Sequence, residues 1–247
     1  MRTYRTFSLK GSNFRISSSH TEVIIDEIKN QRKILEHYIQ KHLQFRSSLK
    51  PVQLFSSYPP IVKAMHYGSE MTGVGPMAAV AGTIAQFAAE KAISEGAEEA
   101  IVENGGDIFL KASHDITIGV YAGAYPISGN LAFFIKPDNT PLAICSSSSK
   151  MGHSLSFGNC DLATVVSKSA PLADAAATLA GNLIKTKSDI NSVLNRIHSI
   201  EGIDGVLLVK DTHIGLIGNL PELVKHSDTD FPDKITRDKN SGYFIFL

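Results

Sequence analysis

Apolar residues recur at the spacing of an amphipathic helix between about Asp26 and Gln44. Ile28, Leu35 and Leu43 fall on one face of this helix, while lysines and an arginine occupy the other face. Such a basic face is typical of a solvated helix surface. Similar patterns, together with turn signals, predict further helices over residues 61–71, 76–95, 171–184 and 190–197.

Two of these helices are rich in small residues. Pro76 is suited to the first turn of the earlier one, because the N–H group that proline lacks would be unpaired there. Gly96 follows this helix, where a C-terminal glycine is expected, and Pro171 opens the later helix. The alanines and glycines of both helices would let another element, or a ligand, approach the backbone closely.

Runs of β-branched and aromatic residues predict strands through much of the chain. The first residues predict an opening pair of strands, at 14–16 and 23–25, and the segment 100–135 is predicted to form a sheet meander. Asp211 and Thr212 mark the turn of a later hairpin. Further predicted strands cover residues 100–104, 107–111, 116–121, 131–135, 142–145, 162–166, 205–209 and 214–217.

This arrangement predicts an α/β protein of the α+β type, with layered mixed or antiparallel sheets and packed helices. The chain has 247 residues, 43% of them hydrophobic and 19% charged, which is the composition of a folded globular protein. We expect a single domain over residues 1–226 and a polar C-terminal extension over 227–247. The extension ends in the apolar run 243–247, which is suited to adding an edge strand or to docking on a partner.

Charge and cysteine content narrow the classes of function. Lys and Arg number 24, and Asp and Glu number 24, so no broad field would draw the protein to nucleic acid or to an anionic membrane. Cys145 and Cys160 are too few to staple a secreted scaffold and form no Cys-x-x-Cys pair, which favours reduced thiols. The chain shows no signal-peptide core and no apolar stretch of membrane length, so we expect a cytoplasmic protein.

The strongest candidate for chemistry lies in the helix over 171–184. A four-residue spacing places Asp174 and Thr178 on one helix face, with Asn182 one turn further. Their oxygens are hard donors suited to Mg²⁺ or Ca²⁺ rather than to zinc, and Mg²⁺ usually completes its shell with phosphate oxygens and water. In the structural alternative, Asp174 complements the helix dipole and Thr178 bonds back to a carbonyl group.

A second candidate is the turn Asn104-Gly105-Gly106-Asp107, which joins two predicted strands. Gly105 and Gly106 can adopt positive φ and bring bare backbone N–H groups up to a ligand. The alternative is a plain type I′ hairpin turn, which the same two glycines would serve equally well.

Two further places offer groups to an anionic ligand. His153 and Ser154 follow a serine-rich run and could supply an imidazole and a hydroxyl to a ligand or a proton transfer. Gly75 and Ala78 lie at a predicted helix N-terminus, where a phosphate could bind. We set a Rossmann fold and a hydrolase triad aside, because the segment before Gly75 is predicted helical and the segment around Ser154 lacks the second glycine of a nucleophile elbow.

Four segments taken in order, Gly75–Gly82, Val102–Ile108, Gly152–Ser154 and Ala173–Thr178, resemble the ApbE-like superfamily and most closely its compact, poorly characterised branch. The resemblance spans roughly residues 64–184. Full ApbE proteins are magnesium-dependent flavin transferases that move FMN from FAD onto a threonine of a target protein. The resemblance implies their compact layered, T-fold-like domain, with the ligand where helices and sheets meet.

The resemblance also implies site residues. It assigns Asp174 and Thr178 to the metal, the Gly105-Gly106 turn to the flavin and His153 to the transferase site. It implies Mg²⁺ as cofactor and FAD or a related nucleotide as ligand.

Three functions stay open, because Ala78–Gly82 contains no lysine where the family pattern has Ala-Lys-Gly, and because the chain is shorter than a full transferase and differs from it in the N-terminal region. The first is Mg²⁺-dependent flavin transfer or FAD pyrophosphate chemistry. The second is a noncatalytic flavin or nucleotide carrier. The third is an accessory protein in cofactor or sulfur metabolism that acts through a protein partner, with the apolar C-terminus and Cys160 as candidate contact points.

Overall fold

The structure is a computed structural model that describes residues 2–54, 57–122, 131–149 and 157–225. Its strands are β1 (Arg5–Leu9), β2 (Ser12–Ser18), β3 (Ala100–Asn104), β4 (Asp107–Lys111), β5 (Ile116–Val120), β6 (Leu131–Ile135), β7 (Leu142–Ser147), β8 (Leu162–Ser167), β9 (Ile203–Lys210), β10 (His213–Gly218) and β11 (Glu222–Lys225). Its α-helices are α1 (Thr21–Lys41), α2 (Leu43–Ser47), α3 (Pro60–Thr72), α4 (Val80–Ser94), α5 (Ala170–Leu183) and α6 (Ile190–His198). Short 3₁₀ turns are η1 (Pro76–Ala79), η2 (Pro137–Asn139) and η3 (Lys187–Asp189).

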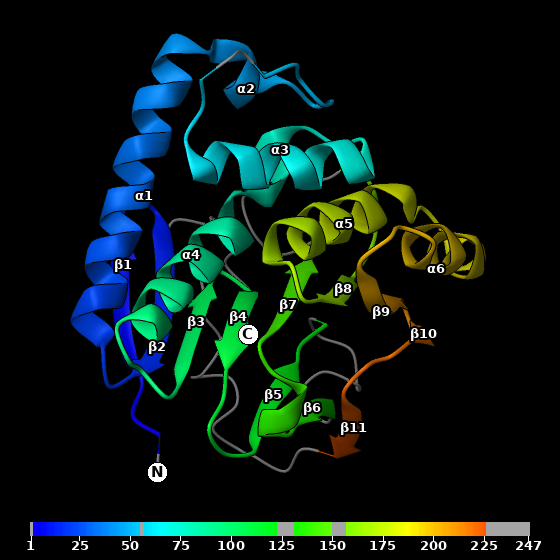
Figure 1. Cartoon of the computed structure of the whole chain (residues 1–247). Helices are drawn as coiled ribbons and strands as arrows, with labels where there is room; N and C mark the ends of the chain where they lie inside the picture. The colour runs from blue at the N-terminus through cyan, green and yellow to red at the C-terminus, as the bar shows by residue number, and fades with distance from the viewer. Residues whose placement is uncertain (1, 55–56, 123–130, 150–156, 226–247) are drawn as a thin grey trace, which may run out of the picture.

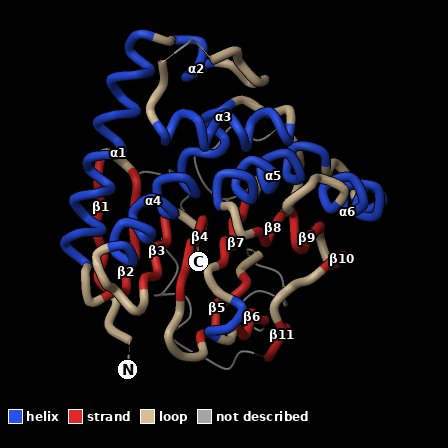
Figure 2. Tube along the Cα trace, viewed as in Figure 1, coloured by secondary structure: helices blue, strands red, loops and turns tan. Residues whose placement is uncertain are grey.

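The described strands form two antiparallel sheets. The larger has eight strands in the order β1-β2-β3-β4-β7-β8-β9-β10, and the smaller has three in the order β11-β6-β5. Figure 1 shows the helices gathered at one side of the larger sheet, with the smaller sheet beneath it. Figure 2 shows the same separation of helices from strands. The expected α+β class with layered sheets and packed helices is confirmed.

Two hydrophobic clusters hold the layers together. One lies between the helices and the larger sheet, and the other lies between the two sheets. Strand β9 contributes side chains to both clusters, because successive side chains of a strand point to opposite faces of the sheet. Val206 and Leu208 join the cluster under the helices, whereas Leu207 and Val209 join the cluster between the sheets. Burial on both faces explains why these strands are nearly continuous apolar runs.

The prediction of a second N-terminal strand at 23–25 is wrong, because that segment belongs to α1. The helix begins at Thr21, five residues before the predicted start. Ile24, Ile25 and Ile28 are all buried, and their spacing places them on one face of a helix. The partner of β2 is instead β1, which pairs Phe7 with Phe14.

Two other boundaries differ from the prediction. The segment 100–135 is not one meander, because β5 and β6 leave the larger sheet and pair with each other and with β11 in the smaller one. The helix predicted from Pro76 starts as the 3₁₀ turn η1, and regular α-helical structure begins only at Val80. Gly96 does follow this helix with φ of +102°, as expected for a C-terminal glycine.

The other predicted elements agree with their positions within a few residues, whereas β1 and β11 were not predicted. Helices α3, α5 and α6 occupy the segments expected for them, and β9 and β10 form a hairpin at Asp211, which adopts φ of +55°. No helix in the described part of the chain is both long and apolar enough to cross a membrane. The predicted edge strand at 243–247 lies outside the described residues.

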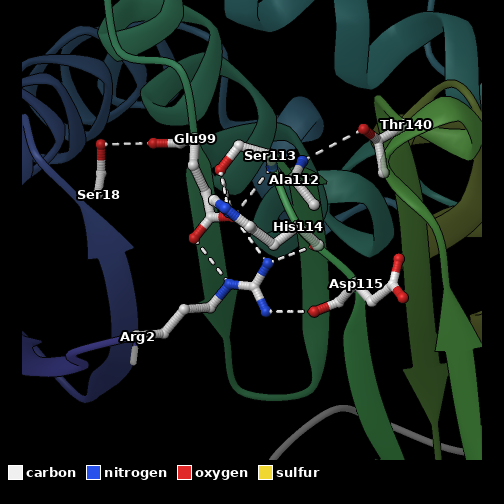
Figure 3. A network of polar contacts seen from close by, with 8 residues as sticks. All are labelled: Arg2, Ser18, Glu99, Ala112, Ser113, His114, Asp115 and Thr140. Atoms are coloured by element: carbon white, nitrogen blue, oxygen red, sulfur yellow. Dashed lines mark hydrogen bonds and ion pairs between the residues drawn. The ribbon is translucent and has the colours of Figure 1, made fainter.

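A network of polar contacts near the N-terminus ties the two sheets together. The Arg2 guanidinium donates to both carboxylate oxygens of Glu99, at 2.7 and 2.8 Å, and to the carbonyl groups of His114 and Asp115. Ser113 also donates to Glu99, through its N–H group at 3.0 Å. Figure 3 shows these residues converging where the chain passes from β4 to β5. Arg2 thus holds the connection between the larger and the smaller sheet in place.

Candidate functional site: a buried carboxylate pair beneath two helices

The turn between β3 and β4 adopts left-handed backbone conformations. Gly105 and Gly106 have φ of +64° and +105°, as a type I′ turn requires. A Cβ atom added at either glycine would meet nothing within 4 Å, so the turn opens onto free space.

Asn104, just before the turn, donates from Nδ2 to the Ala81 carbonyl oxygen at 3.2 Å and connects the hairpin to the start of α4. The hairpin interpretation is confirmed, and the exposed glycine backbone remains open to a ligand.

Asp174 lies on α5 and faces the first turn of α4. Its Oδ2 atom accepts a 2.8 Å hydrogen bond from the Gly82 N–H group, and the Ala81 N–H group also bonds this carboxylate. Gly82 permits the approach, because a Cβ atom there would lie 2.7 Å from the Ala170 carbonyl oxygen and 3.0 Å from Asp174 Cβ. The carboxylate therefore caps the N-terminal end of α4, rather than complementing the dipole of its own helix.

Asp107, the first residue of β4, joins Asp174 in what we call the carboxylate pair. Both are nearly inaccessible, with 7% and 8% of their surfaces exposed. Burial and then the charge of Asp174 raise the pKa of Asp107 well above its ordinary value. Burial also raises the pKa of Asp174 to about 7, although hydrogen bonds from α4 oppose the shift. Two buried carboxyl groups that repel each other require a shared proton or a compensating cation.

Strand β7 supplies the other polar contacts of Asp107. The Ser146 N–H group donates to Asp107 Oδ1 at 3.3 Å, and the Cys145 thiol also hydrogen-bonds this carboxyl group. Burial, reinforced by the two nearby carboxylates, raises the pKa of Cys145 well above its ordinary value. The Cys145 thiol, whose Sγ atom also lies 3.7 Å from the Ala170 carbonyl oxygen, is therefore protonated and is not an activated nucleophile.

Three other predicted site residues, Thr178, Gly75 and Ala78, lie on α5 and at η1. Thr178 lies one turn beyond Asp174 on α5 and is half-buried, so the expected common face is confirmed. Gly75 directly precedes η1 and Ala78 lies within it, and the Ala78 N–H group donates to the Gly75 carbonyl oxygen at 3.0 Å. A Cβ atom at Gly75 would overlap the Ser48 carbonyl oxygen, so close packing already accounts for this glycine. A ligand role for Gly75 and Ala78 stays a prediction.

His153 and Ser154 lie outside the described residues, and their place in the site also stays a prediction. The next residue that the structure describes is Phe157, and its N–H group donates to Asn182 Oδ1 at 2.9 Å. Asn182 lies two turns beyond Asp174 on α5. Phe157, the first described residue after this gap, is therefore held to the helix that carries Asp174.

The prediction that Cys160 contacts a partner is wrong. Its side chain is fully buried, with Sγ 3.5 Å from the Val209 carbonyl oxygen, and burial raises the pKa of its thiol to about 12. Cys145 and Cys160 are both free thiols, as the sequence predicts.

The carboxylate pair has the donor chemistry of a magnesium site. Within the described ranges, no three His, Cys, Asp or Glu side chains gather in a way that could hold a metal ion. Mg²⁺, however, often takes only one or two protein carboxylates and fills the rest of its shell with water and a ligand's phosphates. The Thr178 hydroxyl adds a hard oxygen on the same helix face as Asp174. A cation here would also remove the repulsion that raises the pKa of Asp107.

Sequence reasoning missed two residues that shape this site. Gly82 donates to Asp174, and Cys145 contacts Asp107. Gly82 closes the Gly75–Gly82 segment of the family resemblance, which gave it no role of its own, and Cys145 lies within the apolar strand β7 and belongs to no motif. The small residues around Gly82 did predict a close approach to the backbone, but not the identity of the approaching group.

Comparisons with known proteins agree with this architecture. A family described as AbpE bacteria matches residues 13–201. A UPF0280 protein of Methanococcus maripaludis is 46% identical over 202 residues, which cover 80% of this chain and 82% of the relative. A UPF0280 protein of Methanocella arvoryzae is 37% identical over 246 residues, covering 96% and 99% of the two chains.

Solved structures show the same fold at low sequence identity. The apo flavinyl transferase ApbE of Pseudomonas stutzeri matches 90% of this chain and 95% of its own, with a TM-score of 0.57 and 12% identity. The ApbE protein of Thermotoga maritima matches 96% of this chain and 100% of its own, with a TM-score of 0.55 and 12% identity. The chain therefore belongs to the AbpE bacteria family and is a member of the ApbE-like superfamily.

Proposed function

We propose that the protein binds a flavin nucleotide, FAD or a close relative, together with Mg²⁺ at the carboxylate pair. The observation that carries this proposal is the burial of Asp107 and Asp174 at the junction of the larger sheet, α4 and α5. Burying two carboxyl groups is costly unless a proton or a cation compensates them. The fold shared with flavin transferases makes a flavin nucleotide the first ligand to test.

Different residues of the chain would bind the cation and the nucleotide. Asp107, Asp174 and Thr178 would hold the cation, which would neutralise the charge of the ligand's pyrophosphate. The exposed backbone of Gly105 and Gly106 would lie against the ligand, because these glycines leave open space at the hairpin tip. Gly75, Ala78, Asn104 and Ser154 remain proposed ligand contacts.

Asp174 would also connect ligand binding to the helices. It already holds the first turn of α4 through Gly82. A cation bound to the same carboxylate would therefore strengthen the contact between α4 and α5 by keeping Asp174 ionised. His153 is the proposed proton acceptor if the protein also transfers the flavin.

Transfer and simple carriage differ in a measurable product. In transfer from FAD, a hydroxyl oxygen of the acceptor would form a bond to the FMN phosphorus, the pyrophosphate bond would break, and AMP would leave while the hydroxyl proton passes to a base. A carrier would bind the same nucleotide and return it unchanged. Because Ala78–Gly82 contains no lysine where the family pattern has one, both functions should be tested with one preparation.

The direct test is a titration of metal-stripped protein with FAD, followed by flavin fluorescence, with and without Mg²⁺. We expect Mg²⁺ to tighten binding at least tenfold, and we expect Asp174→Asn to abolish that gain. Asp138→Asn is the matched control, because it removes one exposed carboxylate on η2. Chromatography of the mixture for AMP and FMN separates transfer or pyrophosphate cleavage from carriage.

Equal FAD affinity with and without Mg²⁺ in the native protein would contradict the metal site. No FAD binding in any condition would contradict the flavin proposal as a whole.

A further inference from the structure

Strand β10 forms an edge of the larger sheet, and among the described strands nothing pairs with its outer side. Its sequence, His213 to Gly218, contains no Lys, Arg, Asp, Glu or Pro. Charges and prolines are the usual means by which an edge strand avoids pairing with another strand. Strand β1, at the opposite edge, is flanked by ion pairs of Arg5 with Glu22 and of Lys10 with Glu36. The two edges of the sheet therefore differ in how they are protected.

The two faces of β10 are also unequal. A Cβ atom at Gly215 would collide with Ile190 and Leu194, so this face lies tightly against α6. Ile214 and Leu216 point to the other face and are 40% and 48% exposed.

These exposed side chains continue a buried surface. Ile214 pairs with Val209 of β9, and Leu216 pairs with Leu207. Val209 and Leu207 are buried in the cluster between the two sheets. Ile214 and Leu216 therefore extend the apolar face of the larger sheet beyond the area that the smaller sheet covers.

We propose that the C-terminal run 243–247 of the same chain pairs with the outer edge of β10 as a ninth strand. This run, Tyr-Phe-Ile-Phe-Leu, is apolar at every position and rich in residues that favour strands. A strand paired with β10 would extend both faces of the sheet. One of its faces would lie on the side of α6, and the other would continue the apolar surface of Ile214 and Leu216, so the strand would need apolar side chains on both faces. Its five residues match the six of β10.

The connection permits this pairing. Strand β11 ends at Lys225, in the smaller sheet that packs under β9. The polar spacer 226–242 has seventeen residues, which span up to about 56 Å when extended. A chain of this length folds to a radius of gyration of roughly 18 Å, so a spacer that spans about three times this distance is long enough to connect the smaller sheet with β10.

Hydrogen exchange of the full-length protein tests the proposal. The amides of β10 that point away from β9 should be protected in the native chain, and deleting residues 243–247 should speed their exchange at least tenfold. Leu216→Lys should release the run in the full chain, because it places a charge beside the proposed strand. Leu43→Lys is the matched control, since Leu43 is 68% exposed on α2 and should leave β10 protected.

Each outcome bears on the assignment. Loss of β10 protection in the truncated chain and in Leu216→Lys, at every protein concentration, would support pairing within the chain. Unchanged exchange after truncation would overturn it. Protection that disappears on dilution, together with a concentration-dependent molecular mass, would also overturn it and would make a second copy of the chain the occupant.

Discussion

Asp174 shows how one side chain can serve the fold and a ligand at the same time. It caps α4 through Gly82, and its burial raises its pKa to about 7. Because the pKa is raised above the unfolded value, the folded protein binds more protons than the unfolded chain between about pH 4 and pH 7. The stability contributed by the protonated group is therefore lost as pH rises through this window. In the absence of a cation, the protein should be less stable at pH 8 than at pH 5.

Asp174→Asn should remove the part of this pH dependence that Asp174 contributes and leave the part that the buried Asp107 contributes. An amide cannot ionise, and its oxygen can still accept from the Gly82 N–H group. We expect the metal-free variant to have a higher melting temperature than the native protein at pH 8, by roughly 2–4 °C for each 1 kcal/mol gained. Thermal unfolding from pH 4 to pH 8 measures the effect, and added Mg²⁺ should stabilise only the native protein. A native profile as flat as that of the variant would contradict the shifted pKa.

Gly82 decides whether α4 and α5 can approach each other. Gly82→Ala would place a Cβ atom 2.7 Å from the Ala170 carbonyl oxygen, which belongs to rigid backbone. We expect a loss of about 1–3 kcal/mol in the free energy of unfolding, because the helices must move apart. Urea denaturation provides the measurement. Lys91→Ala on the same helix is exposed and should change stability by no more than about 0.5 kcal/mol.

The β3–β4 hairpin is an element whose turn and ligand roles can be separated. Gly105→Asn should preserve the turn, since asparagine tolerates the left-handed conformation better than other side chains and meets open space here. We expect little change in melting temperature but a loss of at least tenfold in FAD affinity, because the new side chain would cover the bare backbone. Gly96→Asn, at another positive-φ glycine after α4, should leave the affinity unchanged. Unaltered affinity in Gly105→Asn would indicate that the glycines serve the turn alone.

The elements that sequence patterns predict best are those with a local cause. Proline, glycine and helical spacing located α3, α5 and the β3–β4 turn, because these signals act within a few residues. The segment 23–25 was misassigned, since a short run of Val and Ile fits a strand or a buried helix face equally well until its packing is known. The departure of β5 and β6 to a second sheet depends on contacts between distant residues, which periodicity does not encode.

In the candidate site too, the sequence predicts the features that have a local cause and not those that depend on the packing of distant elements. The spacing of Asp174 and Thr178 and the two turn glycines were visible in the sequence. The pairing of Asp107 with Asp174, and the contacts of Gly82 and Cys145, arise only when β4, β7, α4 and α5 pack together.

For the molecule as a whole, the contact between Arg2 and Glu99 should act as a fastening between the two sheets. Arg2 and other contacts lower the pKa of Glu99, although burial opposes them. A lowered pKa means that this stabilisation is present above the unfolded value, near pH 4.5, and is lost as pH falls through the lower folded value. Glu99→Gln should therefore reduce stability at pH 7 by about 1 kcal/mol and make no difference in strong acid. Glu98→Gln is the exposed control, and melting curves at several pH values measure both.

We propose that the carboxylate pair is a cation-dependent flavin site within this layered fold. The most direct measurement is a crystal structure of the protein with FAD and Mn²⁺, which replaces Mg²⁺ and scatters anomalously. We predict an anomalous peak in bonding distance of Asp174, with the flavin pyrophosphate on its open side. An ordered flavin bound elsewhere, or an Asp107–Asp174 pair that holds no metal when FAD is bound, would contradict the claim.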